Sequence, residues 1–390
     1  MINITDPKNC CGCTACESIC GKNAITMKPD ALGFLYPVVD LEKCVECGMC
    51  EKVCAFHENY DVTLNLPQAE AYAVRHKDMH ELETSRSGGM FVAASDYVLE
   101  LGGVVYGVGY KEHFRVAHKR AVTKEERNEF KGSKYVQSDL TGIFRQVKAD
   151  LRAGLPVLFS GTPCQTSGLA SFIGPRLREN LYLIDIVCHG VPGPYIWRDY
   201  VDYMEKKMGA PLEKVNFRDK QLFGWSAHRE SFTAGGECKD NYTYTHLFYE
   251  HIMFRHCCEV CPFANMKRPS DITLADFWGW QNKVPGFNAD NKGVSLVLVN
   301  TEKGRKLISL VKDSLNILPT EADTNVNPNL RRPSVISPKR DSFEKDYEAH
   351  GLDYVMRHYG NVGIRYKMRV VRRKFRTFMR KISRRCGFGG

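Results

Sequence analysis

Cysteines are the chemically most active residues of this 390-residue sequence, and nine of the sixteen lie within residues 1–62. Eight of these nine form two copies of the spacing C-x2-C-x2-C-x3-C, 34 residues apart. The copies are Cys10, Cys13, Cys16 and Cys20, and Cys44, Cys47, Cys50 and Cys54. In this spacing three thiolates surround one [4Fe–4S] cluster, and the fourth cysteine of each copy binds the other cluster. We therefore expect one cluster on Cys10, Cys13, Cys16 and Cys54, and a second cluster on Cys44, Cys47, Cys50 and Cys20.

The same segment resembles bacterial dicluster ferredoxins. A pair of zinc sites is the alternative, although zinc sites rarely use this spacing. Gly12 and Gly48 suit a backbone that must curl tightly around an inorganic core. After each fourth cysteine, Gly21 and Ala55 stand where the ferredoxin pattern usually has proline. Cys11 is an additional cysteine that we do not expect to bind iron.

Four further cysteines lie near the ends of predicted strands or in a short pair. Cys164 follows an apolar strand and a Gly-Thr-Pro turn, and Cys188 ends a second apolar strand. In open α/β sheets the carboxyl ends of the strands form the ligand-binding edge. Cys258 and Cys261 form a C-x2-C pair that lacks two ligands. The pair and the two single cysteines together supply four ligands, which favours a third [4Fe–4S] cluster.

Two other roles remain open for Cys164 at this point. It is either a nucleophile, with His189 as its candidate base, or a buried structural thiol. No acidic residue that would orient His189 is evident. A nicotinamide cofactor is not expected, because the glycines of residues 102–110 do not form G-x-G-x-x-G between a strand and a helix.

The elements that must position these residues follow from the hydrophobic pattern. Residues 24–40 predict a hairpin that covers the clusters, and the polar segment 55–68, which ends near a proline, predicts a linker. Residues 70–76 and 102–110 predict strands on either side of a helix. That helix opens at Ser85, Ser87, Gly88 and Gly89. Such a start suits phosphate binding at the positive end of the helix dipole, and an ordinary capped helix is the alternative.

Composition indicates a globular protein of two or three domains, with 43% hydrophobic and 26% charged residues. No apolar run of about 18 residues predicts a membrane-spanning helix. The first residues show neither the basic nor the apolar region of a secretory signal, so a cytoplasmic location is expected. Disulfides are rare in a reducing cytosol, which favours metal ligation or redox chemistry for the cysteines.

The net charge of +10 is concentrated at the carboxyl end, where eleven Lys or Arg and no acidic residue follow Gly360. The rest of the chain carries 10 − 11 = −1, so no nucleic-acid binding is expected. Apolar residues recur there at helical spacing: Ile364, Met368, Val371, Phe375, Phe378, Met379 and Ile382. A basic amphipathic helix of this kind favours an anionic membrane surface. The alternatives for this helix are docking on the body and contact with a nucleic acid or an acidic partner.

Six short motifs in the body resemble the coenzyme F420 hydrogenase/dehydrogenase beta-subunit family, in order and spacing, over roughly residues 70–320. They are "SRSGGMF", "GSKYVQS", "GTPCQ", "VCHG", "CEVC" and "SDITLADFWG". The resemblance implies that Cys164, Cys188, Cys258 and Cys261 hold a [4Fe–4S] cluster beside a flavin, FAD or FMN. It also implies flavin contacts at Ser87, Gly88, Gly89, Lys134, Tyr135, Gln165 and Gly279.

The expected fold class is α/β (α+β). Four segments are expected: 1–62, a dicluster ferredoxin domain; 70–150 and 151–325, the two parts of a mixed-sheet flavin and iron–sulfur domain; and 326–390, a Pro-rich linker and basic tail. The expected activity is that of an iron–sulfur flavoprotein oxidoreductase. It would relay electrons between a ferredoxin-type or deazaflavin (coenzyme F420-like) donor, three clusters and a flavin that exchanges hydride with an organic substrate.

Two rival functions accompany this expectation. One is an electron-transfer subunit that has no substrate of its own and serves a partner enzyme. The other is a non-redox module in which the clusters only staple the fold. The sequence identifies no catalytic residue, substrate, direction of electron flow or oligomeric state. In the insert, within residues 217–232, Lys220, Trp225 and His228 either line a substrate pocket or belong to a folded excursion with a buried tryptophan.

Overall fold

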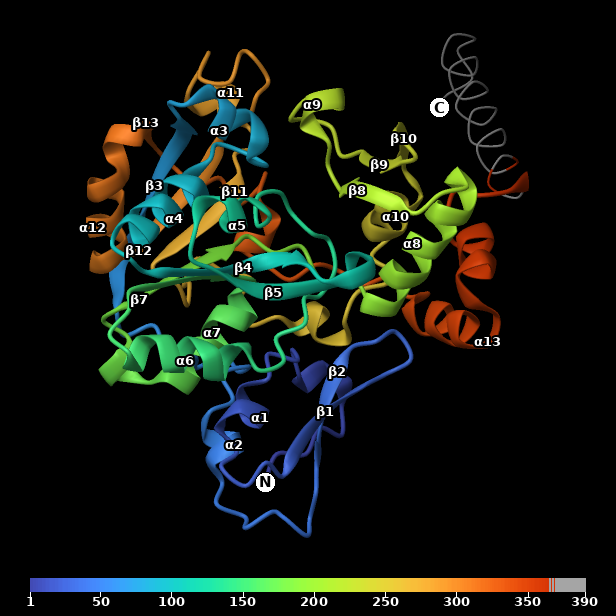
Figure 1. The fold of residues 1–390 in the computed structure, drawn as a ribbon, viewed down its shortest axis with the longest axis horizontal. Coiled ribbons are helices and arrows are strands. Elements are labelled where there is room, and N and C mark those ends of the chain that lie inside the picture. Colours follow the sequence, from blue (N-terminus) through green and yellow to red (C-terminus); the bar gives the residue numbers. More distant parts are fainter. Residues whose placement is uncertain (365, 367, 369–390) are drawn as a thin grey trace, which may run out of the picture.

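The computed structural model describes residues 1–364, 366 and 368 (Figure 1). The basic helix expected after Gly360 falls almost wholly outside the described residues, so its predicted membrane contact stays a prediction. Among the described residues, no helix combines the length and the apolar composition needed to cross a membrane.

The amino-terminal domain consists of short elements around the cysteine loops. The expected hairpin is confirmed, because β1 (Ile25–Pro29) pairs antiparallel with β2 (Leu35–Val39). Each cysteine loop runs into a short helix, α1 (Ala15–Ile19) in the first copy and α2 (Met49–Lys52) in the second. The domain packs below the body, against the helices that cover one face of the main sheet (Figure 1).

The body is built on one eight-stranded mixed sheet with the strand order β13-β3-β12-β11-β7-β6-β4-β5, which confirms the α/β class. The strands are β3 (Asn65–His76), β4 (Val104–Tyr110), β5 (Val116–Ala121), β6 (Val157–Gly161), β7 (Leu181–Ile186), β11 (Ile272–Asp276), β12 (Ser295–Thr301) and β13 (Leu315–Thr320). The central strands β4, β6, β7 and β11 are parallel, so their carboxyl ends meet at one edge.

Helices cover both faces of this sheet. One face carries α4 (Met90–Glu100) and α12 (Glu302–Val311), and the other carries α6 (Ile143–Arg152) and α7 (Pro163–Ile173). The apolar core under α6 and α7 also contains Ala15 and Val53, so the amino-terminal domain shares a core with the body. Shorter helices are α3 (Met79–Thr84), α5 (Lys124–Asn128), α9 (Lys220–Phe223) and α11 (Trp280–Lys283).

A second, three-stranded sheet flanks the body in the order β10-β9-β8. Its strands are β8 (Leu212–Asn216), β9 (Glu230–Ala234) and β10 (Glu237–Asn241). The helices α8 (Pro194–Met208), α10 (Thr243–Tyr249) and α13 (Arg340–His358) pack around it. Aromatic side chains fill this core, and the buried Trp197 ring lies 4.3 Å from the Phe217 ring.

Two segments expected as linkers are folded parts of the body. In the segment 55–68, Tyr60 is buried and donates to the Lys267 carbonyl, and β3 begins at Asn65. The polar composition misled because most of this stretch is an irregular loop, and Pro67 and Gln68 at the start of β3 are exposed. The segment 326–339 is also packed, since Asn329 and Leu330 are buried.

Candidate iron–sulfur centres and cofactor cavity

The two cysteine loops of the amino-terminal domain repeat one backbone geometry. Left-handed residues occur at Gly12 and Thr14 in the first copy and at Glu46 and Gly48 in the second. Glycine adopts this conformation without strain, which explains Gly12 and Gly48. The repeated geometry turns the thiols of each loop toward a common centre.

The second cluster site, named here the outer site, is an open cavity of about 310 Å³. The four thiols predicted for it all line this cavity: Cys20, Cys44, Cys47 and Cys50. The Ile2 amide donates to the Cys50 sulfur and the Ala24 amide donates to the Cys20 sulfur, each at 3.3 Å. Cys47 is exposed. A cavity lined by four thiols with amide donors on the sulfurs fits a [4Fe–4S] cluster.

The first cluster site, named here the inner site, gathers Cys10, Cys13, Cys16 and Cys54. Burial raises the pKa of Cys16, and the nearby Cys13, Cys10 and Cys54 sulfurs raise it further. The Cys16 thiol therefore lies near the other three, which together are the set that the spacing predicts for one cluster. Cys16 is buried at 8% exposure, whereas the outer site has no buried cysteine among its four.

A third group of thiols lies at the carboxyl edge of the main sheet. Cys164 is the second residue of α7, directly after β6, and Cys188 follows the neighbouring strand β7. Cys258 and Cys261 lie in and after a short 3-10 turn, His256–Val260. Burial raises the pKa of Cys188, and so do the Cys258, Cys164 and Cys261 sulfurs. We name this group the third site.

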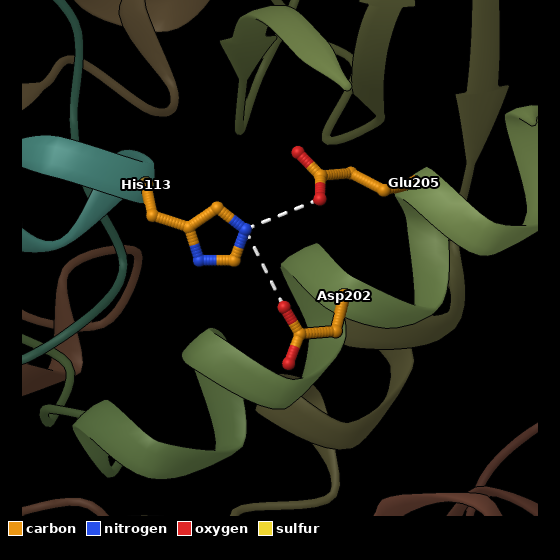
Figure 2. Close-up of side chains that lie close together, drawn as sticks. All are labelled: His113, Asp202 and Glu205. Carbon is orange, nitrogen blue, oxygen red and sulfur yellow. Dashed lines mark hydrogen bonds and ion pairs between the residues drawn. The ribbon is translucent and has the colours of Figure 1, made fainter. Parts of the chain in front are cut away.

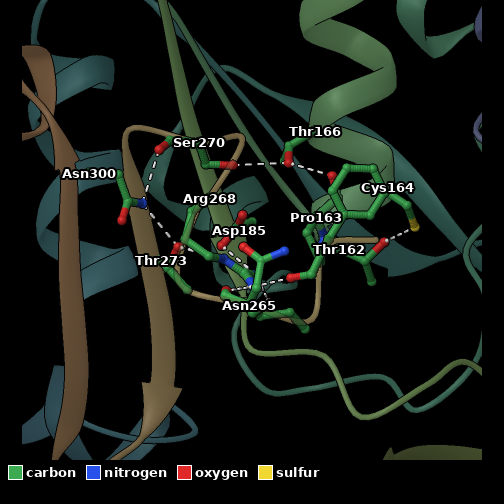
Figure 3. A network of polar contacts seen from close by, with 12 residues as sticks. Thr162, Pro163, Cys164, Thr166, Asp185, Asn265, Arg268, Ser270, Thr273 and Asn300 are labelled. Carbon is green, nitrogen blue, oxygen red and sulfur yellow. Dashed lines mark hydrogen bonds and ion pairs between the residues drawn. The ribbon is translucent and has the colours of Figure 1, made fainter. Parts of the chain in front are cut away.

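A buried polar network fixes Cys164 relative to the loop that follows Cys261 (Figure 3). On α7, Thr166 accepts a 2.9 Å hydrogen bond from Ser270. Arg268 donates to Asp185 at 3.1 Å and to the Phe263 carbonyl at 2.7 Å, so it ties β7 to that loop. These buried contacts link the elements that carry the thiols.

Among the described residues, in none of the three cysteine groups do three sulfurs lie as close together as the ligands of a single metal ion. In the described part of the chain, the group of three ligand atoms that lie within 4.8 Å of one another is His113, Asp202 and Glu205. Sulfurs around one tetrahedral zinc lie only about 4 Å apart. The wider cysteine groups fit a multi-atom cluster better than zinc.

The His113 group itself lies on the surface (Figure 2). Its Nε2 atom is 3.2 Å from Glu205 and 3.4 Å from Asp202, both of which project from α8. His113 and Asp202 are exposed. Ion pairing accounts for this contact, and we assign no metal to it.

The inner and third sites touch through Cys11, the cysteine to which the sequence assigned no iron. The Cys11 thiol lies close enough to the Cys13 and Cys164 sulfurs to lower the pKa of both. On α7, a Cβ atom at Gly168 would lie 2.7 Å from the Cys13 sulfur. The absence of a side chain at Gly168 therefore lets the inner site approach the helix that begins beside Cys164.

A large cavity of about 500 Å³ opens beside the third site. It lies at the carboxyl edge of the parallel strands, and Cys188 is part of its wall. The amino-terminal end of α4 forms another part, through Gly89, Met90 and Phe91. No side chain caps this helix end. Its free N–H groups and dipole suit a phosphate.

Five of the seven predicted flavin residues line this cavity: Ser87, Gly89, Lys134, Tyr135 and Gln165. The other two, Gly88 and Gly279, do not. A Cβ atom at Gly88 would lie 1.9 Å from the Val74 carbonyl oxygen, so this glycine allows α4 to approach β3. Gly279 is the left-handed residue that precedes α11.

Several of the five have side-chain partners inside the protein. Ser87 donates to the Val294 carbonyl at 2.7 Å, and Gln165 donates to Ser138 at 3.0 Å. Burial lowers the pKa of Lys134 to about 7. These contacts hold the loops that shape the wall of the cavity.

Positive charge exceeds negative charge where the cavity meets the insert. Arg86 and Arg218 line the wall, and the Nε atom of each is buried without a partner. Asp276 is paired with Arg218 at 2.5 Å. Orphaned guanidinium donors beside an uncapped helix end fit an anionic, phosphate-bearing group such as a flavin nucleotide.

The sequence interpretation missed Arg86 and Arg218, and it also missed Val326, Asn327, Pro328 and Asn329, which line the same cavity. Arg86 lies inside the quoted motif "SRSGGMF", so its position was an available signal. The three insert residues named from the sequence do not line the cavity in the structure. Trp225 is buried and donates to Ser87 at 3.1 Å, as the folded-excursion alternative expects.

Comparison with known proteins supports this organisation. Residues 155–324 match a family model that describes the carboxyl-terminal part of the beta subunit of coenzyme F420 hydrogenase/dehydrogenase. Residues 9–57 match the model of the 4Fe–4S dicluster domain. The resemblances predicted from the motifs are thus confirmed over these two segments, which join a [4Fe–4S] domain to a segment of an oxidoreductase family.

One solved structure with a similar fold is the F420-reducing [NiFe] hydrogenase complex from Methanosarcina barkeri, in a xenon-derivatised form. The matched chain is 16% identical, with a TM-score of 0.46, and the match covers 74% of this chain and 91% of that chain. Comparison with curated proteins found no match.

Proposed function

We propose that this chain is an iron–sulfur flavoprotein oxidoreductase in which the outer, inner and third sites and the cavity form one line of redox centres. A ferredoxin-type or deazaflavin (coenzyme F420-like) donor would supply electrons, and an organic substrate would exchange hydride at the cavity. The observation that carries the proposal is continuity. The inner site packs against Gly168 of α7, the helix that also carries Cys164 of the third site, and Cys188 of the third site lines the cavity wall.

The cysteines would hold three [4Fe–4S] clusters, and the cavity would hold FAD or FMN. Such clusters carry single electrons and a flavin carries two, so the combination links one-electron donors to hydride chemistry. The protein would supply the thiolates, orient them through the network around Arg268, and exclude water from the inner and third sites.

In the cavity, the proposed flavin contacts are those predicted from the family resemblance: Ser87, Gly88, Gly89, Lys134, Tyr135, Gln165 and Gly279. The uncapped end of α4 and the two partnerless arginine Nε atoms support a phosphate there. For Gly88 and Gly279, which do not line the cavity, the proposed role is to shape its walls.

A second candidate function is an electron-transfer subunit that passes electrons to a partner enzyme. The matching family model describes a beta subunit, which favours this candidate. This candidate predicts a stable complex on purification and no turnover with small molecules.

The test of the proposal is anaerobic iron and flavin analysis of wild type and Cys164→Ser. Three clusters amount to about twelve irons per chain, and loss of the third leaves about eight. The matched control is Cys238→Ser, because Cys238 is exposed on β10 and belongs to none of the three sites. We expect about twelve, eight and twelve irons for wild type, Cys164→Ser and Cys238→Ser, with one flavin in wild type. About eight irons in all three proteins would refute the third cluster.

A further inference from the structure

Arg255 is a buried arginine at the contact between the inner site and the body. Its side chain has 0% exposure. The guanidinium donates to the Cys10 carbonyl at 2.8 Å, to Gln137 at 2.9 Å and to the Leu35 carbonyl at 2.9 Å. A further contact of 3.7 Å joins Nη2 to the Cys10 sulfur. The guanidinium therefore touches a ligand of the inner site directly.

The charge of Arg255 has no carboxylate partner, which sets it apart from the other buried arginines of the described chain. Each of those arginines forms an ion pair within 4.0 Å: Arg127 with Asp96, Arg178 with Asp271, Arg218 with Asp276, Arg268 with Asp185 and Arg340 with Glu344. For Arg255 no such pair exists among the described residues, and its oxygen acceptors are all neutral. An uncompensated buried charge is strongly destabilising.

The sulfurs are the best-placed source of the compensating negative charge, since the Asp30 carboxyl, which also interacts with Arg255, lies beyond ion-pair distance. Thiols lie beside the guanidinium: the Cys10 sulfur is 3.7 Å away, and the Cys257 sulfur helps to raise the pKa of Arg255. Tyr36 and Phe34 cover the guanidinium, with ring centroids 4.2 Å and 5.3 Å away, and keep water from it. A cluster bound by four thiolates is anionic, so the inner site would supply the missing counter-charge.

We propose that Arg255 sets the reduction potential of the inner cluster and raises it relative to that of the outer cluster. This inference rests on the proposed function, since it requires a cluster at the inner site. When a one-electron donor protein reduces that cluster, the donor loses one electron and the cluster gains one negative charge. The buried guanidinium stabilises the added charge and needs no proton transfer. Reduction potential depends on the charge and hydrogen bonds around the sulfurs.

The outer site has no such residue among the described part of the chain. Of the residues that line it, Met1 carries the terminal ammonium group, which pairs with Glu51 at 2.9 Å, and Lys22 and Glu46 are also charged. All three residues are exposed to solvent, which screens their charges. The sulfur contacts described there come from backbone amides. Electrons that reach the outer cluster are thus drawn inward, toward the centre with the buried positive charge.

The test is an anaerobic redox titration of the full-length holoprotein, followed by electron paramagnetic resonance. The steps are assigned with Cys16→Ser and Cys47→Ser. In Arg255→Gln and Arg255→Met we expect the reduction equilibrium of the inner cluster to fall about tenfold, which is about 59 mV for one electron. The outer cluster should not move. Arg255→Lys keeps the charge and should stay within about threefold of wild type.

The control is Arg127→Gln, which removes a buried arginine that pairs with Asp96, outside the cysteine sites. It should leave every potential unchanged. An unchanged inner potential in the neutral Arg255 variants, or an equal shift of inner and outer potentials, would overturn the role of Arg255. If either Arg255→Gln or Arg255→Met loses iron, the inner potential measured in the other variant decides the test. Iron analysis of the same samples separates the two failures: a wild type without an inner cluster overturns the proposed function as well, whereas full iron with an unmoved potential overturns Arg255 alone.

Discussion

The inner and outer sites have the same cysteine spacing and the same left-handed loop positions, yet their surroundings differ. The outer site is lined by residues of the amino-terminal domain and includes the exposed Cys47. The inner site lies against α7 and Arg255 of the body. Duplication of a motif therefore produced two equivalent ligand sets, and tertiary contacts made one of them an exposed terminus and the other a buried junction.

This difference indicates a direction. On the proposed function, an exposed outer cluster would be accessible to an external protein donor, whereas a buried inner cluster would exchange electrons within the chain. A nearby buried positive charge at the inner site favours the same order. The predictions that follow test whether the two sites differ as strongly in behaviour as they do in surroundings.

The largest difference is expected between Cys16→Ser and Cys47→Ser. Each removes one ligand and should lower the iron content by about four per chain. Cys16→Ser should also destabilise the protein by roughly 3–5 kcal/mol, because α1 shares its core with the body and loses the cluster that orders it. Cys47→Ser should cost clearly less. Iron analysis and anaerobic thermal unfolding measure both, and equal stabilities would remove the distinction between the sites.

Chelation after mild oxidation should separate the sites without any mutation. The outer site is open to solvent and the inner site is covered by the body. We expect about four of about twelve irons to be released in a first, faster phase. Wild type and Cys47→Ser provide the comparison, because the variant should lack this phase. Release of all irons in one phase would contradict the difference in exposure.

Gly168→Ala should disturb the inner site selectively. The added methyl group would lie 2.7 Å from the Cys13 sulfur, so α7 or the cysteine loop has to move. We expect a loss of about 1–3 kcal/mol in unfolding free energy and partial loss of the inner cluster. The matched control is Gly21→Ala, since no atom lies within 4 Å of the new methyl group. Similar iron contents and stabilities in both variants would show that the close approach does not matter.

The smallest effect is expected from Arg145→Ala. Arg145 projects from α6 and donates to the Ser18 and Glu17 carbonyls at 3.1 Å and 2.9 Å, near the end of α1. Loss of these hydrogen bonds should cost about 0.5–1.5 kcal/mol and leave the iron content unchanged. Arg152→Ala, at the exposed end of the same helix, is the control. A loss of iron in Arg145→Ala would contradict this expectation, because it would show that the iron sites depend on the Arg145 hydrogen bonds to the amino-terminal domain.

The sequence predicted those parts of the site that depend on local spacing. The grouping of the amino-terminal thiols follows from the two copies of the motif, and the hairpin follows from alternating apolar residues. Cys164 and Cys188 were predicted to lie together because parallel strands end at one edge of a sheet. These groupings could be predicted because each depends only on a local sequence pattern or on a general rule of topology.

The parts that depend on distant contacts could not be predicted. Nothing near Arg255 in the sequence shows that its charge is buried against Cys10, 245 residues away. The contact of Gly168 with Cys13 is equally long-range. Arg86 and Arg218 meet at one cavity only because the insert folds back on the start of α4. Segment 55–68 was interpreted as a linker because its composition does not show the distant contact by which the buried Tyr60 docks on the Lys267 carbonyl.

The most direct test of the central claim is the rate at which a reduced ferredoxin reduces the bound flavin, measured by anaerobic stopped-flow absorbance. If electrons enter at the outer cluster and leave through the inner one, both Cys47→Ser and Cys16→Ser should slow flavin reduction by about a hundredfold or more, a barrier increase of roughly 3 kcal/mol. Cys238→Ser should match wild type. Flavin reduction at the wild-type rate in Cys47→Ser would contradict the account, because the outer cluster would then lie outside the path of the electrons.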